Sequence, residues 1–173
     1  MVKLAEACKN LPVSFVLVGD GSEKNRLREN SMGNKQIYYL GFQNQTFMPA
    51  IYRMGDIYIL PSKTETWGIG VNEAMACGRP VMVSEKVGCG IDLVQDKNTG
   101  IIFRLGDIET CYQFLKNLSE NRDKLKEMGA NALQLIQSFT FSQIVESISQ
   151  TMEKINLTNA PAKNKDRIHT VLF

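Results

Sequence analysis

Two carboxylates and three glycines lie close together between residues 65 and 78. The segment reads Glu65-Thr66-Trp67-Gly68-Ile69-Gly70-Val71-Asn72-Glu73 and continues through an Ala/Met-rich run to Gly78. A carboxylate can accept two hydroxyl donors, which suits the vicinal diols of sugars, and glycine lets a ligand approach the backbone closely. A helix starting near Gly70 would direct its first N–H groups at an anion such as a diphosphate. The segment therefore predicts a site for a phosphorylated sugar compound.

Five short apolar runs would place this segment at the edge of a sheet. They cover residues 13–18, 36–40, 56–60, 80–84 and 100–103, and helical patterns follow at 23–30, 46–54, 71–77, 107–118, 122–137 and 141–155. Runs that are rich in Ile and Val and nearly continuous in apolar residues are typical of parallel strands covered on both faces. The alternation predicts an α/β fold with a right-handed, doubly wound parallel sheet, Rossmann-like in type.

Ligands of open α/β sheets bind beyond the carboxyl ends of the strands. In this chain those ends carry Gly19 to Gly21, Gly41 with Phe42, and Ser62 to Gly70. Before the first run, residues 2–8 resemble the end of a helix, without the strand that normally precedes one in a doubly wound domain. Apolar periodicity stops after Asn156. We expect one domain over residues 1–155 and a polar, flexible tail over 156–173.

Composition argues against several functional classes. The net charge is only +2, from 20 Lys and Arg against 18 Asp and Glu, so no nucleic-acid surface is expected. The Gly19-x-Gly21 pattern has Lys24 where a dinucleotide fingerprint needs glycine. No apolar run is long enough for a membrane span and no signal peptide opens the chain, which favours a cytoplasmic protein.

Metal and thiol chemistry are not expected either. The four cysteines, Cys8, Cys77, Cys89 and Cys111, form no C-x-x-C pair, and the sole histidine is His169 near the end. These features favour packed, reduced thiols and a solvated His169 over a zinc site. The chain has no Asp-x-Asp pair, so we expect neither a metal nor a cofactor.

An ordered set of short motifs resembles the group 1 glycosyltransferases, retaining enzymes of the GT-B type that use nucleotide-activated sugars. Glu65 and Glu73 resemble that family's Glu-x7-Glu signature. The matching words, in order, are Val18-Gly19-Asp20-Gly21, Leu40-Gly41-Phe42, Met54-Gly55-Asp56, Leu60-Pro61-Ser62 and Glu73-Ala74-Met75-Ala76-Cys77-Gly78. The resemblance covers roughly residues 1–155 and implies the C-terminal, donor-binding half of a two-domain fold.

The resemblance also implies residue roles. Glu65, the catalytic candidate, would bond hydroxyls of the transferred sugar, and Glu73 would hold the ribose hydroxyls. Backbone N–H groups of Trp67, Gly68 and Ile69 would meet the sugar and phosphates. Gly41 and Phe42 would lie near the base, and Gly19 near the diphosphate. The donor would be a nucleotide-diphospho sugar. A saccharide or lipid-linked acceptor, and any contact with a membrane surface, would involve an N-terminal domain outside this chain.

The chain departs from the family pattern in three ways. The Arg and Lys that neutralise the leaving diphosphate would lie upstream of Met1. The acceptor domain is absent, so we expect this chain alone to be inactive. The segment from Gly88 to Asp92 replaces the usual Glu-Ile pair, and no site residue is placed there.

Structural readings of the same residues stay open. Glu73, placed in a first helical turn, would complement the helix dipole without any ligand, and Glu65 would be an ordinary loop carboxylate. Trp67 and Phe42 would be core residues, and Cys77 and Cys89 packed side chains. The rival functions are a non-catalytic nucleotide-sugar-binding half-domain and a GT-B epimerase or phosphorylase, although no histidine lies at the predicted cleft.

Overall fold

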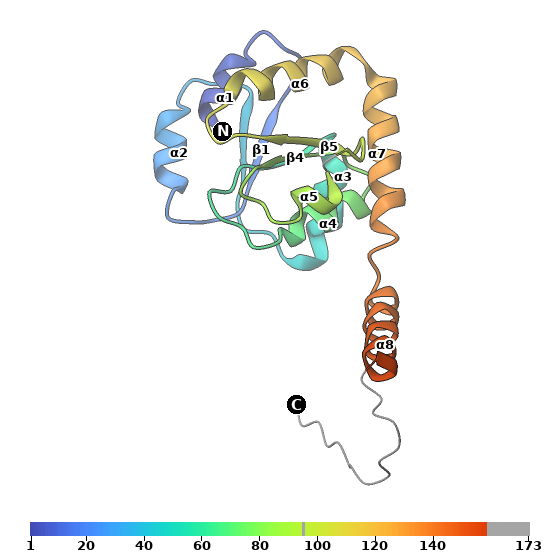
Figure 1. Ribbon diagram of the computed structural model, residues 1–173. Helices are drawn as coiled ribbons and strands as arrows, with labels where there is room; N and C mark the ends of the chain where they lie inside the picture. The colour runs from blue at the N-terminus through green and yellow to red at the C-terminus, as the bar shows by residue number, and fades with distance from the viewer. Residues whose placement is uncertain (95, 159–173) are drawn as a thin grey trace. The chain divides into compact units, whose positions relative to one another are not determined.

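A computed structural model describes residues 1–94 and 96–158 of the 173-residue chain. The chain divides into two compact units, Met1–Gln137 and Ser138–Phe173. The first unit holds every strand and all but one of the helices of the described residues (Figure 1). It therefore contains every residue that the sequence assigns to the donor site.

Every strand pair of the first unit is parallel. They are β1 (Phe15–Val18), β2 (Ile37–Leu40), β3 (Tyr58–Leu60), β4 (Val81–Ser84) and β5 (Gly100–Phe103). Phe15 pairs with Ile37, Tyr58 with Val81, and Val81 with Gly100. The α/β class and the parallel pairing predicted from the sequence are confirmed.

The sheet consists of two hydrogen-bonded parts. One part has the order β1-β2 and the other the order β3-β4-β5. Within the described residues, β1 and β3 each pair with one neighbour only. The single doubly wound sheet expected from the sequence is thus divided into two hydrogen-bonded parts.

Helices follow the strands with the predicted alternation. Their bounds are α1 Val2–Ala7, α2 Lys24–Asn30, α3 Met48–Met54 after a 3-10 turn at Gln45–Phe47, α4 Ile69–Ala76, α5 Gly90–Leu93, α6 Ile108–Glu120 and α7 Arg122–Ile136. Side-chain caps begin the two long helices: Asp107 accepts a hydrogen bond from the Thr110 N–H, and Asn121 one from the Lys124 N–H, each at 3.0 Å. The short helix α5 was not predicted, because its glycine-rich sequence carries no helical period.

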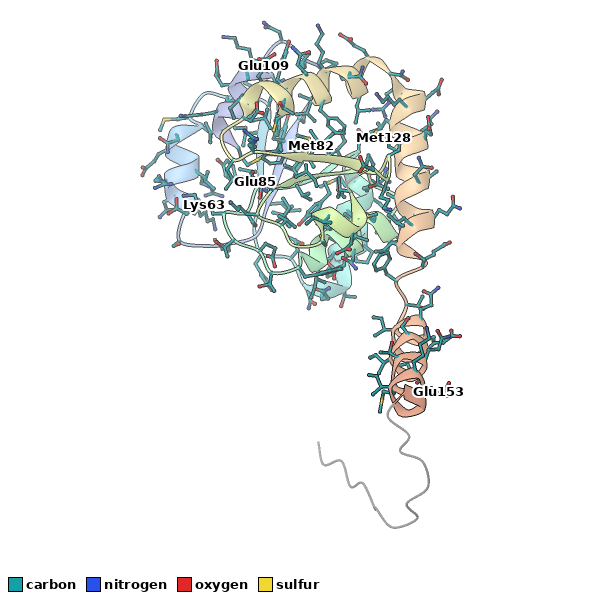
Figure 2. The ribbon with its side chains drawn as sticks, in the orientation of Figure 1. Lys63, Met82, Glu85, Glu109, Met128 and Glu153 are labelled. Carbon is teal, nitrogen blue, oxygen red and sulfur yellow. The ribbon has the colours of Figure 1, made fainter. Side chains whose placement is uncertain are left out.

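Helices cover both faces of the larger sheet. In Figure 1, α1 and α6 lie above its strands and α3, α4 and α5 below them. Strand β4 is buried at all four positions. Val81 and Val83 pack into the cluster with α3, α4 and α7, while Met82, labelled in Figure 2, packs into the cluster with α1 and α6. This double burial explains the continuous apolar run of β4.

The second unit contributes helix α8, Phe141–Thr158. Exposed apolar side chains recur along it at helical spacing: Ile144, Val145, Ile148, Met152 and Ile155. The helix runs three residues past its predicted end at 155, into the region predicted as tail. The remainder of that tail, including His169, lies outside the described residues.

Candidate donor site

The loop that carries Glu65 is fixed by backbone hydrogen bonds to the loop after β4. The Glu65 N–H donates to the Lys86 carbonyl at 3.2 Å, and the Gly88 N–H donates to the Glu65 carbonyl at 3.0 Å. The Cys89 N–H bonds the Trp67 carbonyl at 3.0 Å. A Cβ on Gly88 would collide with the carbonyl oxygen of Thr66. The segment from Gly88 to Asp92, where no site residue was predicted, therefore supports the Glu65 loop.

Gly68 makes the turn into helix α4. Its φ of +104° lies in the left-handed region that favours glycine. A Cβ there would lie 3.0 Å from Val87 Cγ1 and 3.3 Å from Leu60 Cδ2. The helix starts at Ile69, immediately after this turn and at the carboxyl end of β3. Its first N–H groups therefore open next to the Glu65 loop.

The sequence predicted Glu73 in the first turn of α4. Because the helix starts at Ile69, before Gly70, Glu73 lies one residue beyond that turn. That removes the helix dipole as the simplest reason for a carboxylate at this position. Both carboxylate oxygens are held by this chain. The Tyr52 hydroxyl donates to Oε2 at 2.8 Å, and Gln45 Nε2 donates to Oε1 at 2.5 Å.

Two tyrosines pack against the start of α4. Tyr52 is buried, and its ring meets that of Tyr58 edge to face with centroids 5.4 Å apart. Burial raises the pKa of Tyr58 to about 12, with smaller contributions from the negative charges of Glu73 and Glu65. Burial, followed by the hydrogen bond to Glu73, also raises the pKa of Tyr52. A Cβ on Gly70 would lie 2.5 Å from the Tyr58 hydroxyl oxygen and 3.3 Å from that of Tyr52, so both phenols lie against the first turn of α4.

Of the other predicted residues of this loop, one packs against the core and one is exposed to solvent. Trp67 is half-buried against the core, and its indole N–H donates to Asn72 Oδ1 at 3.0 Å. Its backbone N–H, predicted to meet the donor, is directed at Glu65 Oε1 at 3.4 Å. The Ile69 side chain is 70% exposed. Trp67 thus anchors the loop while Ile69 faces outward.

Gly19, Gly41 and Phe42 form a second group at the ends of β1 and β2. The Gly19 N–H donates to the carbonyls of Leu40 at 3.1 Å and Gly41 at 3.3 Å, so the two glycines lie together. Phe42 is 76% exposed, which rules out the core reading of this residue. This group belongs to the β1-β2 sheet, whereas Glu65 and Glu73 belong to the β3-β4-β5 part.

Sequence reasoning missed Gln45, Tyr52 and Tyr58. Gln45 stands in the 3-10 turn before α3, Tyr52 on α3 itself, and Tyr58 on β3. Their spacing carries no recognisable motif, and tyrosines in apolar runs read as core residues. Only the packing of α3 against α4 shows that Gln45 and Tyr52 contact Glu73.

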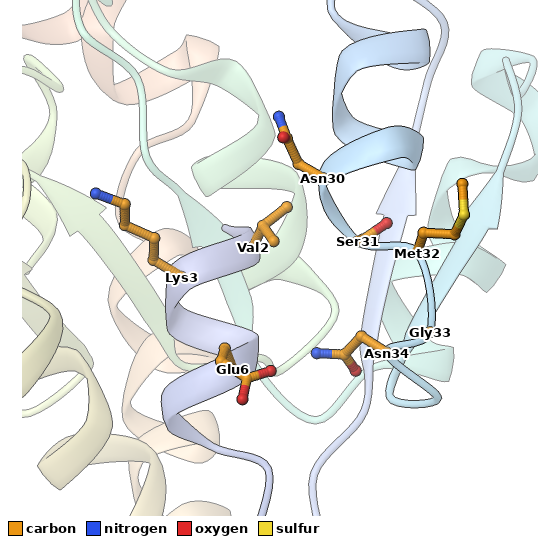
Figure 3. A pocket seen from close by; sticks show the side chains of 8 residues that line it. All are labelled: Val2, Lys3, Glu6, Asn30, Ser31, Met32, Gly33 and Asn34. Carbon is orange, nitrogen blue, oxygen red and sulfur yellow. The ribbon is translucent and has the colours of Figure 1, made fainter.

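A separate hollow of about 540 Å³ lies away from these residues (Figure 3). It is lined by Val2, Lys3 and Glu6 of α1 and by residues 30–34. Residues 30–34 lead into β2 and so lie toward its amino end, opposite to Gly41. Its Ser31 hydroxyl already pairs with the Tyr39 hydroxyl at 2.7 Å. None of the predicted donor-site residues lines this hollow.

The described residues contain neither a cluster of metal ligands nor a membrane-spanning helix. No three His, Cys, Asp or Glu side chains within residues 1–94 and 96–158 group so that they could hold a metal ion. Over the same residues, no helix is both long and apolar enough to cross a bilayer.

Two solved structures have a similar fold. The HepE protein of Anabaena, solved in complex with UDP-glucose, superposes with a TM-score of 0.72 at 24% identity, over 87% of this chain and 44% of that one. Sucrose-phosphate synthase from Thermosynechococcus elongatus gives a TM-score of 0.72 at 20% identity, over 91% of this chain and 42% of that one. At these identities the likeness establishes the GT-B type of fold.

Sequence relatives agree with the structural ones. Sulfoquinovosyl transferase SQD2 of Arabidopsis thaliana is 33% identical over 135 residues, which are 76% of this chain and 25% of the relative. Alpha-monoglucosyldiacylglycerol synthase of Acholeplasma laidlawii is 30% identical over 73% of this chain and 32% of its own length. The chain thus spans well under half the length of these relatives. The family model for glycosyl transferases group 1 matches residues 1–135, and the chain belongs to this family.

Proposed function

We propose that this chain binds the nucleotide-diphospho sugar donor of a retaining group 1 glycosyltransferase, as the C-terminal half of the whole enzyme. One observation carries the proposal: the loop that carries Glu65 leads from the carboxyl end of β3 into α4, the helix that carries Glu73. This is where open α/β sheets bind their ligands. The family membership and the UDP-glucose complex of HepE support a nucleotide sugar as the ligand.

In this proposal the two carboxylates have different tasks. Glu73, held by Tyr52 and Gln45, accepts the ribose hydroxyls, since each carboxylate oxygen can accept a second hydrogen bond. Glu65, on a loop fixed to Lys86 and Gly88, bonds hydroxyls of the transferred sugar. Gly19 and Gly41 lie near the diphosphate and base, with the exposed Phe42 ring beside the base. Catalysis is then mainly a matter of positioning and charge stabilisation.

The acceptor is proposed by analogy with the relatives. The relatives include a diphosphoundecaprenol-directed galactosyltransferase of Escherichia coli and the diacylglycerol enzyme named above. We therefore propose a saccharide or lipid-linked acceptor that binds to a domain outside this chain, in the cytoplasm. Donor binding is proposed to need no metal ion, because the two carboxylates serve hydroxyl groups in this arrangement.

The role assignment is tested by calorimetry with UDP-glucose and UDP on wild type, Glu73→Ala and Glu65→Ala. Charge-assisted hydrogen bonds contribute about 1.5–3 kcal/mol each. Glu73→Ala should lower the affinity for both ligands by roughly tenfold to a few hundredfold. Glu65→Ala should lower the affinity for UDP-glucose and leave the affinity for UDP nearly unchanged.

Control measurements distinguish a lost binding contact from unfolding of a variant and from a wrong choice of nucleotide sugar. Thermal denaturation should show that both variants remain folded, and other nucleotide sugars replace UDP-glucose if wild type does not bind it. Equal losses of both ligands in Glu65→Ala would overturn its assignment to the sugar. A tenfold loss of wild-type affinity on adding a chelator would contradict metal-independent binding.

A further inference from the structure

The hydrogen bond between Gln45 and Glu73 joins the two groups of predicted donor residues. Gln45 lies in the 3-10 turn that follows the exit of β2, shortly after Gly41 and Phe42. Its Nε2 donates to Glu73 Oε1 at 2.5 Å, across 28 residues of chain. Glu73 belongs to α4, which follows β3 in the other part of the sheet. Gln45 therefore links the segment assigned to the base with the carboxylate assigned to the ribose.

The turn that carries Gln45 is fixed by hydrogen bonds of its own. The Asn44 side chain caps it by accepting from the Thr46 N–H at 3.3 Å, and the Phe47 N–H donates to the Asn44 carbonyl at 2.9 Å. Helix α3 continues directly from this turn. The Gln45 side chain thus starts from a defined backbone position, and its direction toward Glu73 follows from the local fold.

The Gln45 amide keeps hydrogen-bonding groups that the fold does not use. A primary amide has two N–H donors and one carbonyl oxygen that accepts. Among the residues that the structure describes, the side chain bonds only to Glu73, through one N–H, and it is exposed to solvent. A second N–H and the amide oxygen of Gln45 are therefore open beside the carboxylate, where a ligand of Glu73 would meet them.

A carboxylate next to a free amide N–H matches the chemistry of a hydroxyl group. A hydroxyl donates one hydrogen bond and also accepts through its lone pairs, whereas an ionised carboxylate can only accept. Glu73 alone would satisfy the proton of a bound hydroxyl and leave its oxygen without a donor. The second N–H of Gln45 supplies that donor. The pair thus favours a hydroxyl over a bare C–H, and the charge of Glu73 disfavours a phosphate at the same place.

We propose that Gln45 is a specificity-determining residue that binds the 2′-hydroxyl of the donor ribose together with Glu73. The inference rests on the proposed function, which places the ribose at Glu73. The 2′-carbon is the neighbour of the carbon that carries the base, and Gln45 follows the base segment of Gly41 and Phe42 along the chain. Of the two ribose hydroxyls, the 2′-hydroxyl is therefore assigned to Gln45. The site selects ribonucleotides over 2′-deoxyribonucleotides and over nucleotides with a 2′-phosphate.

The test combines one substitution with three ligands. Calorimetry on the full chain measures the affinities of wild type and Gln45→Met for UDP, 2′-deoxy-UDP and 3′-deoxy-UDP. Methionine keeps the length of the side chain and removes the amide. We expect the substitution to lower the affinity for UDP and 3′-deoxy-UDP by about five- to tenfold, the effect of one hydrogen bond. The affinity for 2′-deoxy-UDP should stay within about twofold, because that ligand lacks the contact already.

The chain offers a matched control for this substitution. Gln113 Nε2 donates to Glu109 Oε1 at 2.7 Å in an exposed pair on α6, and Glu109 is labelled in Figure 2. Gln113→Met removes the same kind of hydrogen bond and should leave all three affinities within about twofold. Gln45→Glu keeps the length of the side chain but has no N–H donor. It should lower the affinity for UDP at least as much as Gln45→Met, and wild-type affinity in this variant would contradict the donor role.

The pattern of losses separates this inference from the donor-site proposal. Equal losses for UDP and 2′-deoxy-UDP in Gln45→Met would mean that Gln45 only orients Glu73, and would overturn the direct contact. A loss that disappears with 3′-deoxy-UDP would assign Gln45 to the other hydroxyl, against the proposal. Unchanged affinity for UDP in Gln45→Met, while Glu73→Ala lowers it, would overturn the inference and leave the donor site in place. No binding of UDP, GDP or ADP by the wild type at about 1 mM would overturn both.

Discussion

At the scale of single residues, Glu73 is the most constrained carboxylate of the candidate site. It receives hydrogen bonds from Tyr52 and Gln45, which come from the segment before β3 rather than from its own helix. A carboxylate held in this way loses little side-chain freedom when a ligand binds. The buried tyrosine therefore acts as a positioning residue for Glu73.

Replacing Tyr52 by phenylalanine should separate positioning from packing. Tyr52→Phe keeps the ring against Tyr58 and removes the donor to Glu73. We expect a loss of about 1–2 kcal/mol in the free energy of unfolding and a severalfold weaker affinity for UDP. Urea denaturation and calorimetry measure the two quantities. Tyr112→Phe, on α6 and outside this cluster, is the control, and equal effects of the two substitutions would contradict the positioning role.

The raised pKa of Tyr58 predicts a loss of stability at alkaline pH. Its pKa is 10 in its ordinary state and about 12 in the fold, so the folded protein holds the proton more tightly. The stabilisation is complete below pH 10 and is lost as the pH rises from 10 to 12, because only the unfolded chain releases the proton there. Urea denaturation across this range should show the fall. Tyr58→Phe should reduce it, and an unchanged pH profile in that variant would refute the assignment.

At the scale of elements, helix α4 is held in place by α7. Gly129 of α7 lies against the backbone of Gly78, just past the end of α4, and a Cβ on Gly129 would collide with the Gly78 carbonyl oxygen. Met128, the neighbouring residue labelled in Figure 2, is buried with Leu118 and Leu125. The position of Glu73 therefore depends on a close contact between two helix backbones.

Gly129→Ala should destabilise the protein although alanine favours helix. The clash with a backbone carbonyl can be relieved only by moving α7 away from α4, at a net cost of about 1–3 kcal/mol. Thermal or urea denaturation measures the change. Gln134→Ala, at an exposed site on the same helix, should be close to neutral. Stabilisation of Gly129→Ala by about 1 kcal/mol, the ordinary helix-propensity gain, would show that the contact is loose.

At the scale of the whole molecule, the chain corresponds to part of its relatives. It covers 25% of the sulfoquinovosyl transferase and 44% of HepE. The proposed donor residues lie on this part, whereas the acceptor site and the basic pair for the leaving diphosphate are expected outside it. Donor binding and sugar transfer can therefore be separated experimentally.

We expect the isolated chain to bind donor without transferring sugar at a useful rate. Absence of the basic pair alone should lower the rate about a hundredfold or more, before the loss of acceptor contacts is considered. Product formation from radiolabelled UDP-glucose, with saccharide and lipid-linked acceptors, measures this. Multiple turnovers by the isolated chain would show that it is catalytically complete.

Much of the fold was predictable because local signals agree with it. The Ile- and Val-rich runs predicted the five strands to within two residues, and the caps Asp107 and Asn121 mark the start of α6 and α7. Helix α5 and the exact start of α4 were not predictable, since the turn at Gly68 and the packing of α5 depend on distant residues such as Val87 and Ile102.

The sequence by itself determined the family, the parallel α/β class and the two glutamates of the candidate site, because these depend on short motifs and on periodicity within single elements. Only the tertiary structure decided what surrounds those glutamates. Tyr52 and Gln45 reach Glu73 across 21 and 28 residues of chain. Contacts at that separation arise from the packing of finished elements, and no local pattern of residues encodes them.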